Sequence, residues 1–176
     1  MTLMADDLFV LDDRRSGDYS SSLGTAWRLI SDRVMGGVSS GQLALDHVDG
    51  RDCLRLRGDV RLDNRGGFLQ AALDLKSSAA AFDAVAYQGV LLDVYGTGET
   101  YNVHLRSADV WLPWQAYRAS FRAAPGWQSV QLPFEAFEPY RIGSPLDVTK
   151  LERLGIVAIG RAFTADLCVA RVALYK

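Results

Sequence analysis

Two groups of side chains in this 176-residue chain have types and spacings suited to binding another molecule. In the first, Asp32-Arg33 is followed by Met35 and two glycines, a few residues after Trp27. Arg33 can offer a bidentate guanidinium to a carboxylate or a sugar hydroxyl, with Asp32 as an acceptor. The alternative is structural: Asp32 caps the turn and the stem of Arg33 packs over Trp27. Because consecutive glycines allow unusual backbone angles, we expect a shaped loop under either interpretation.

The second group lies on two alternating segments and the loop between them: Asn102, His104, Arg106, Arg118 and Ser120, with Trp111 and Trp114 in the loop. If the two segments pair as strands, one sheet face carries amide, imidazole and guanidinium groups beside two indole rings. Polar groups that fix orientation, next to aromatic planes that stack on a ring, are typical of sugar recognition. The alternative is a solvated sheet face with aromatic residues plugging the end of a sandwich.

The sequence lacks the usual arrangements of catalytic side chains. It has only two histidines, and His47 is expected to face Asp52 across a hairpin as a local pair. No Gly-x-Ser-x-Gly or phosphate-loop pattern is present, and Gly96-Thr97-Gly98 is expected to be a hairpin turn. No spacing of carboxylates, histidines and cysteines is typical of a metal site. We therefore expect no catalytic residue, no metal and no cofactor, and not an enzyme.

Composition indicates one globular domain over residues 1–176. The chain is 49% hydrophobic and 23% charged, which is ordinary for a domain with its own core. Its net charge of −2 gives no strong field to attract nucleic acid or an anionic membrane. No apolar run is long enough for a transmembrane segment.

Cys53 and Cys168 each lie in an apolar-rich run, far apart in the chain. Without a Cys-x-x-Cys pair, they are expected to be two reduced thiols in the core, which suits a reducing compartment. The acidic N-terminal segment has neither the features of a secretory signal nor those of a mitochondrial transit peptide. We therefore expect a cytoplasmic protein.

The clearest structural signal is a hairpin centred on Asp49-Gly50, a strong two-residue turn. With those two residues as the loop, Leu45 faces Leu54 and Leu43 faces Leu56, so the turn and the apolar pattern predict the same register. The second strand then turns a charged face outward, with Arg55, Arg57 and Arg61 on it.

Period-two alternation continues through the rest of the chain. It predicts strands over residues 68–75, 88–95, 100–107, 115–121, 127–132, 154–159 and 166–175. Residues 79–84 form either a loop or a short helix, and residues 148–154 one or two helical turns. Eight to ten strands in one domain predict an all-β fold, an antiparallel two-sheet jelly-roll β-sandwich with short peripheral helices at most.

Several segments, taken in order, resemble the complex I intermediate-associated protein family over nearly the whole chain. They are Trp27 with Ser31-Asp-Arg-Val-Met-Gly-Gly-Val-Ser39, Leu56-Arg-Gly58, Asn64-Arg-Gly-Gly-Phe68, Gly89-Val-Leu-Leu-Asp-Val-Tyr-Gly96, Gly98-Glu-Thr-Tyr101, Gly126-Trp-Gln-Ser-Val-Gln-Leu-Pro-Phe134 with Phe137, and the closing strand near residues 169–174. Thr97 stands where the family usually has an acidic residue.

The resemblance implies a galactose-binding-like jelly roll and a non-catalytic protein-binding module, similar to assembly factors (chaperone-like proteins) of the respiratory NADH:ubiquinone oxidoreductase. It implies a protein partner, such as a subunit of that complex, and, since the chain resembles a minimal version of the family, a bacterial source. The alternative is a carbohydrate-binding module that uses the aromatic and polar sheet face, with a saccharide as ligand. The candidate binding residues are Trp27, Asp32, Arg33, Met35, Asn102, His104, Arg106, Trp111, Trp114 and Arg118.

Overall fold

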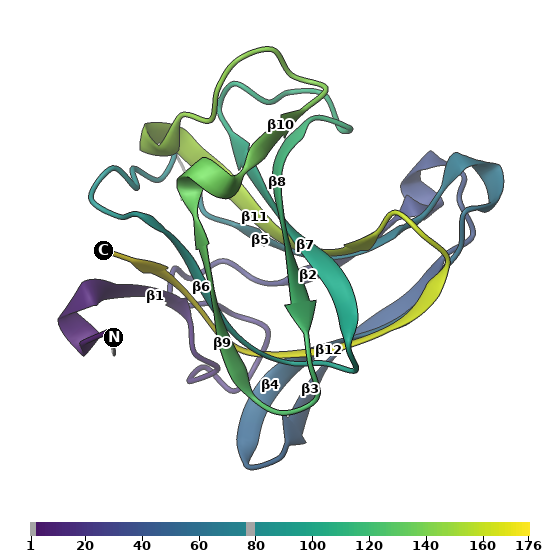
Figure 1. The fold of residues 1–176 in the computed structure, drawn as a ribbon, viewed down its shortest axis with the longest axis horizontal. Coiled ribbons are helices and arrows are strands. Elements are labelled where there is room, and N and C mark those ends of the chain that lie inside the picture. The colour runs from purple at the N-terminus through teal and green to yellow at the C-terminus, as the bar shows by residue number, and fades with distance from the viewer. Residues whose placement is uncertain (1–2, 77–79) are drawn as a thin grey trace.

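The computed structural model describes residues 3–76 and 80–176, which form two six-stranded antiparallel sheets packed face to face. The strands of the first sheet run in the order β3 (Ser40–Val48), β4 (Arg51–Val60), β12 (Phe163–Tyr175), β6 (Gly89–Tyr95) and β9 (Gln128–Pro133), with β1 (Leu8–Asp12) also paired to β12. The strands of the second run in the order β10 (Glu138–Tyr140), β8 (Ala116–Ala123), β7 (Glu99–Ser107), β11 (Leu151–Ile159), β5 (Phe68–Asp74) and β2 (Arg28–Ser31). This all-β sandwich confirms the predicted fold class (Figure 1).

Helical structure in the described residues is limited to five short 3-10 turns: η1 (Ala5–Asp7), η2 (Asp32–Met35), η3 (Asp63–Arg65), η4 (Phe134–Ala136) and η5 (Val148–Lys150). No helix in the two described ranges has the length and apolar character needed to cross a membrane. Of the possible helix at 79–84, residue 79 lies outside the described residues, and 80–84 are not helical because Phe82 bridges to Leu151 instead.

The predicted hairpin register is confirmed. Leu43 pairs with Leu56, Leu45 with Leu54 and His47 with Asp52. Asp49 and Gly50 have φ angles of 44° and 83°, as a tight two-residue hairpin turn requires. The exposed face of this hairpin is held by Arg55, whose guanidinium pairs with Asp46 and with Asp166 on β12.

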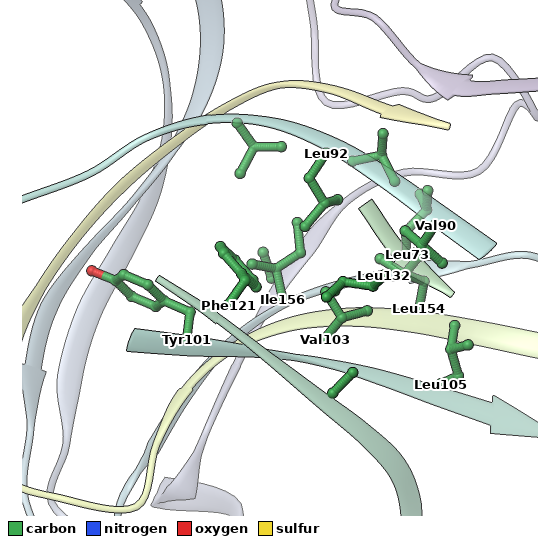
Figure 2. Packing of buried hydrophobic residues seen from close by; sticks show 14 of the residues in the cluster. Leu73, Val90, Leu92, Tyr101, Val103, Leu105, Phe121, Leu132, Leu154 and Ile156 are labelled. Carbon is green, nitrogen blue, oxygen red and sulfur yellow. The ribbon is translucent and has the colours of Figure 1, made fainter. Parts of the chain in front are cut away.

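The core is filled by alternate residues from both sheets. Tyr101, Val103 and Leu105 of β7 face inward, as predicted, and meet Val90 and Leu92 of β6 (Figure 2). All five are 1% exposed or less. Since alternate side chains of β7 pack in the core, the other side chains, including His104 and Arg106, point away from the first sheet.

Three short strands were missing from the sequence prediction, so the described structure has twelve strands rather than eight to ten. They are β1, β2 and β10, of three to five residues each at the margins of the sheets. Short edge strands carry little alternation, and the pairing that creates them is with strands distant in the sequence.

The prediction of a hairpin at Gly96-Thr97-Gly98 is wrong, because β6 and β7, which it joins, lie in different sheets. The N–H groups of Gly96 and Gly98 donate to the carbonyl groups of Ala124 and Ala123, at 3.0 and 2.7 Å. A Cβ at position 96 would lie 2.4 Å from the Ala123 carbonyl oxygen, so the glycine permits this crossing between layers.

The prediction of two reduced thiols is also wrong: Cys53 and Cys168 are buried, but they form a disulfide. They lie on the paired strands β4 and β12, with Cα atoms 5.5 Å apart, within the range a disulfide needs. Because disulfides are rare in the reducing cytosol, the cysteines no longer favour a cytoplasmic location, which stays a prediction.

Candidate functional site

The outward face of the second sheet is hollowed into an open groove of about 520 Å³. Strands β8, β7, β11 and β5 form its floor, and loops at opposite ends of the strands form its walls. Its volume falls within the range of ligand-binding pockets, roughly 300–1,000 Å³. Figure 1 shows these loops rising beyond the ends of β8, β11 and β5.

The centre of the floor is built around a glycine. Gly155 on β11 pairs with His104 on β7, and His104 in turn pairs with Arg118 on β8. A Cβ at Gly155 would lie 1.9 Å from Oε1 of Gln70, a residue of β5. The missing side chain therefore lets the Gln70 amide lie across the floor beside His104.

One wall is the Trp111–Trp114 loop, which Arg106 fastens to the sheet. Its Nη1 donates to the carbonyl groups of Leu112, Pro113 and Gln115 at 3.2, 3.4 and 3.0 Å. The indole rings are left accessible: Trp111 is 79% exposed and Trp114 49%. This side of the groove thus offers two large planar surfaces on a fastened loop.

Beside that loop, Tyr140 at the end of β10 carries two arginines. The guanidinium of Arg118 lies 3.7 Å from the centre of its ring and that of Arg141 at 5.2 Å. Stacking of this kind holds a guanidinium in place without neutralising its charge. The Tyr140 margin is therefore both aromatic and positively charged.

The opposite wall is made by η2 and η3, which the buried Asp32 holds together. Its carboxylate accepts from the N–H and hydroxyl of Ser39 and from the N–H groups of Gly67 and Phe68. Burial acts to raise the pKa of Asp32, but these hydrogen bonds outweigh it and hold the pKa below its ordinary value. Glycines 37 and 66 allow this packing, because a Cβ at either would lie within 2.5 Å of the carboxyl group.

That wall presents apolar side chains to the groove: Val34, Met35, Leu62 and, from β2, Ile30. Ten large hydrophobic side chains are exposed in the described residues, and five of them line the groove: Val34, Met35, Leu62, Trp111 and Trp114. Exposed apolar side chains scattered singly need no explanation, but their gathering in one hollow marks an interaction site.

The charged side chains of the groove are all positive. Five arginines line it, namely Arg65, Arg106, Arg118, Arg141 and Arg153, and none of its lining residues is aspartate or glutamate. Arg153 pairs with Asp74 outside the groove at 3.1 Å, and Arg106 is occupied by the loop carbonyl groups. A chain with a net charge of −2 thus has a positive concave face.

His104 is the polar group of the floor that lacks a partner. Its Nε2 is buried and has no hydrogen-bond partner among the residues described. Burial, and then the positive charges of Arg118 and Arg106, lower the pKa of His104 to about 4. The ring is therefore neutral at pH 7, and a buried polar atom without a partner is a candidate for contact with a ligand.

Six of the ten candidate binding residues line this groove: Met35, His104, Arg106, Trp111, Trp114 and Arg118. The other four lie outside the lining. Trp27 is buried in the core, where its indole N–H donates to Asp12, and Asp32 is the buried carboxylate just described. Arg33 donates to the carbonyl group of Ser39. Asn102 lies on β7, two residues before His104. The buried Asp32 is thus structural, but it does not cap the turn as the alternative expected. Ser31 caps η2 by accepting from the N–H of Arg33.

Sequence reasoning missed Arg65, Gln70, Tyr140, Arg141 and Gly155. Gly155 interrupts an apolar run, which is a signal of close approach in a strand, but nothing in the sequence indicates that Gln70 is its neighbour. In the residues described, no cluster of three or more histidine, cysteine, aspartate or glutamate side chains has the geometry of a metal site.

Comparison with solved structures shows the same fold. The family 11 carbohydrate-binding module of the cellulosomal cellulase Lic26A-Cel5E of Clostridium thermocellum superposes with a TM-score of 0.73 at 12% identity, over 96% of this chain and 94% of the module. The family 11 module from the same organism in complex with a β-1,3-1,4-mixed-linked tetrasaccharide gives the same score and identity, over 96% and 95%. A family 30 module of the C. thermocellum cellulase Cel9D-Cel44B gives 0.57 at 16% identity, over 80% and 91%.

No protein with a curated description matches the chain in sequence. The family model described as complex I intermediate-associated protein 30 matches residues 15–167, which include both walls and the floor of the groove. The chain therefore belongs to the complex I intermediate-associated protein 30 family.

Proposed function

We propose that this protein is a non-catalytic binding module that holds a protein partner in the groove of its second sheet. The composition of the lining carries the proposal. Trp, Tyr, Met and Arg are enriched where proteins bind proteins, whereas Lys, Glu and Asp are depleted there. The groove has two tryptophans, a tyrosine, a methionine and five arginines, and none of the three depleted types.

Family membership supports a partner in respiratory assembly. The family is named for association with an intermediate of complex I, so the proposed partner is a subunit or assembly intermediate of the NADH:ubiquinone oxidoreductase. A fastened, preformed groove suits such a task, since little conformational freedom is lost when the partner docks.

Site-specific photo-cross-linking in the native cell tests this proposal. A benzoylphenylalanine in place of Trp111 stands in the groove, and one in place of Arg57 stands exposed on β4 in the other sheet. We expect position 111 to give a discrete adduct that contains a complex I subunit. No adduct, or the same adducts from position 57, would contradict the proposal.

Saccharide binding is the second candidate, favoured by the exposed Trp111 and Trp114 beside the amide of Gln70 and the imidazole of His104. A family 11 module of like fold has been solved with a mixed-linked tetrasaccharide. Thermal unfolding with that tetrasaccharide separates the candidates. A ligand at 100 times its dissociation constant adds about 2.7 kcal/mol to the free energy of unfolding, so an unchanged melting temperature would count against a neutral glucan.

A further inference from the structure

We propose that the segment held in the groove is an acidic, extended stretch of the partner polypeptide, about eight residues long. This inference rests on the proposed function and adds the chemistry of the partner. It is carried by three arginines in the groove that lack a carboxylate, by the partnerless His104 on its floor and by the direction in which the groove crosses the sheet.

The three arginines are Arg65, Arg118 and Arg141. In residues 3–76 and 80–176 none of them lies within ion-pair distance of an aspartate or glutamate, although most other arginines of the chain do. Arg118 and Arg141 are held against the Tyr140 ring and Arg65 stands on η3 at the opposite wall. Positive charge is thus available at both ends of the groove, which suits a ligand with more than one carboxylate.

His104 adds a hydrogen-bond donor between these ends. Because its ring is neutral, one ring nitrogen carries a proton, and with that proton on the partnerless Nε2 the ring donates to a carboxylate or carbonyl oxygen of the ligand. The neighbouring Arg118 and Arg106 leave the floor positive even with this ring neutral. An acidic or carbonyl-rich chain therefore satisfies a group that the protein leaves without a partner.

The groove runs diagonally over the sheet, from Tyr140 on β10 to η2 and η3, which lie at the ends of β2 and β5. On the way it follows β11 from Arg153 to Ile159. From β10 to β5 the groove crosses four strand spacings of about 4.8 Å, or about 19 Å. From the level of Tyr140 to the start of β5 it also advances six residues of about 3.3 Å along the strands, or about 20 Å. The diagonal is therefore about 28 Å, and about eight residues of extended polypeptide reach from Tyr140 to Arg65. Carboxylates near both ends of such a segment meet the unpaired arginines.

The apolar wall favours a polypeptide over an anionic saccharide. Val34, Met35 and Leu62 are at least half exposed in the groove, and aliphatic side chains offer no plane on which a sugar ring stacks. They do match leucine, valine or phenylalanine side chains of a peptide. The expected segment therefore alternates acidic and apolar residues.

Fluorescence anisotropy with two synthetic probes tests the inference on the full chain. One probe is a fluorescein-labelled nine-residue peptide that alternates glutamate with leucine, and the other has glutamine in place of every glutamate. We expect the acidic peptide to bind at least tenfold more tightly at 50 mM salt and to lose most of that advantage at 500 mM. Equal affinity of the two peptides would overturn the inference.

Variants assign the effect to the groove. The triple variant Arg65→Gln, Arg118→Gln, Arg141→Gln should bind the acidic peptide no better than the amide peptide, with its affinity for the amide peptide within twofold of the wild type, which also reports that it is folded. Arg57→Gln removes an exposed arginine from the other sheet and should leave the tenfold preference intact. Loss of the preference in Arg57→Gln, or its retention in the triple variant, would show that the charge of the whole chain is responsible.

A heptamer of galacturonic acid separates the two sources of carboxylates. We expect it to bind more weakly than the acidic peptide, and stronger binding of the saccharide would overturn the choice of a polypeptide. A partner cross-linked at position 111 through a segment without acidic residues would also overturn this inference, yet it would leave the proposed function standing. Absence of any groove adduct would instead remove the proposed function.

Discussion

At the residue scale, the shape of the groove depends on groups that no ligand touches. Asp32 is fully buried and lies outside the lining, yet its carboxylate accepts four hydrogen bonds. Two come from Ser39, just before β3, and two from Gly67 and Phe68 at the start of β5. A short segment rich in glycine buries few apolar side chains, so packing alone does not fix its conformation. The hydrogen bonds to the buried carboxylate fix it instead and hold the apolar wall in place.

Replacing Asp32 by asparagine should lower the free energy of unfolding by about 3 kcal/mol, because the amide NH₂ turns a donor toward groups that are themselves donors. Urea unfolding measures the change. Asp63→Asn, at an exposed residue of η3 paired only with Arg61, is the matched control and should change stability by less than about 0.5 kcal/mol. Equal effects of the two substitutions would contradict the proposed role of Asp32 in holding these segments together.

His104 should make stability depend on pH in a defined window. Its pKa falls from 6.5 in the unfolded chain to about 4 in the fold, so the unfolded state binds the proton first as pH falls. The contribution of the neutral His104 to the free energy of unfolding is then complete above pH 6.5. It is lost as pH falls toward 4, which lowers that free energy by up to about 3 kcal/mol.

His104→Gln removes the titrating ring and should flatten the stability profile between pH 4.5 and 6.5. Asp32 and the other aspartates with lowered pKa values also contribute stability that is lost as pH falls. Their pKa values in the fold lie below 3.8, so this loss occurs below the window in which His104 titrates. Urea unfolding at half-unit steps of pH, for the two proteins side by side, gives the comparison. Parallel profiles would mean that the imidazole is not buried in the neutral form.

At the element scale, strands and turns were predictable wherever the signal is local. Asp49-Gly50 and the alternation on both sides of it are enough to place Leu43 against Leu56, and β7 and β8 alternate clearly enough to bring His104 beside Arg118. The glycines at 96 and 98 predict a bend, but a bend does not determine whether the next strand joins the same sheet. Which sheet receives β7 depends on packing over the whole core.

The walls of the groove were less predictable than its floor. The two tryptophans and Met35 stand out by type, whereas Tyr140 and Arg141 look like parts of an irregular surface segment. They enter the site because β10 pairs with β8, through three residues whose sequence carries no strand pattern. Likewise, the pairing of Cys53 with Cys168 depends on β4 lying next to β12, across 115 residues of sequence.

The Trp111–Trp114 loop owes its position to one guanidinium, so Arg106→Gln should release it. We expect exchange of the amide hydrogens of Leu112, Trp114 and Gln115 to speed up at least tenfold, because glutamine cannot reach three carbonyl groups at once. Exchange in β12, far from this loop, serves as the internal control and should not change. Unchanged protection over 112–115 would show that the loop is held by other contacts.

The disulfide joins two neighbouring strands of the first sheet and closes a loop of more than a hundred residues. Chain entropy gives a ceiling of about 5 kcal/mol for such a loop, and measured values are typically 2–4 kcal/mol. Reduction with dithiothreitol should therefore lower the free energy of unfolding by about 2–4 kcal/mol. Cys53→Ala, Cys168→Ala should show the same loss and no response to the reductant, whereas a wild type insensitive to the reductant would mean that its thiols are free.

At the scale of the whole molecule, the two sheets have different tasks. The first carries the disulfide, both termini (Figure 1) and the ion-paired face of Arg55, and the second carries the groove on its outward face. The fold is shared with carbohydrate-binding modules at 12% identity, so one architecture carries very different residues. On this chain those residues are arginine, aromatic and aliphatic, and we propose that they suit a polypeptide better than a neutral sugar.

The most direct test of the central claim is quantitative affinity purification of the chain from its native cells, in three forms. These are the wild type, the groove variant Trp111→Ala, Trp114→Ala, and the control Arg57→Gln on the other sheet. We expect complex I subunits to accompany the wild type and the control equally and to fall at least tenfold with the groove variant. Recovery of those subunits in equal amounts with all three forms, or with none, would contradict the account.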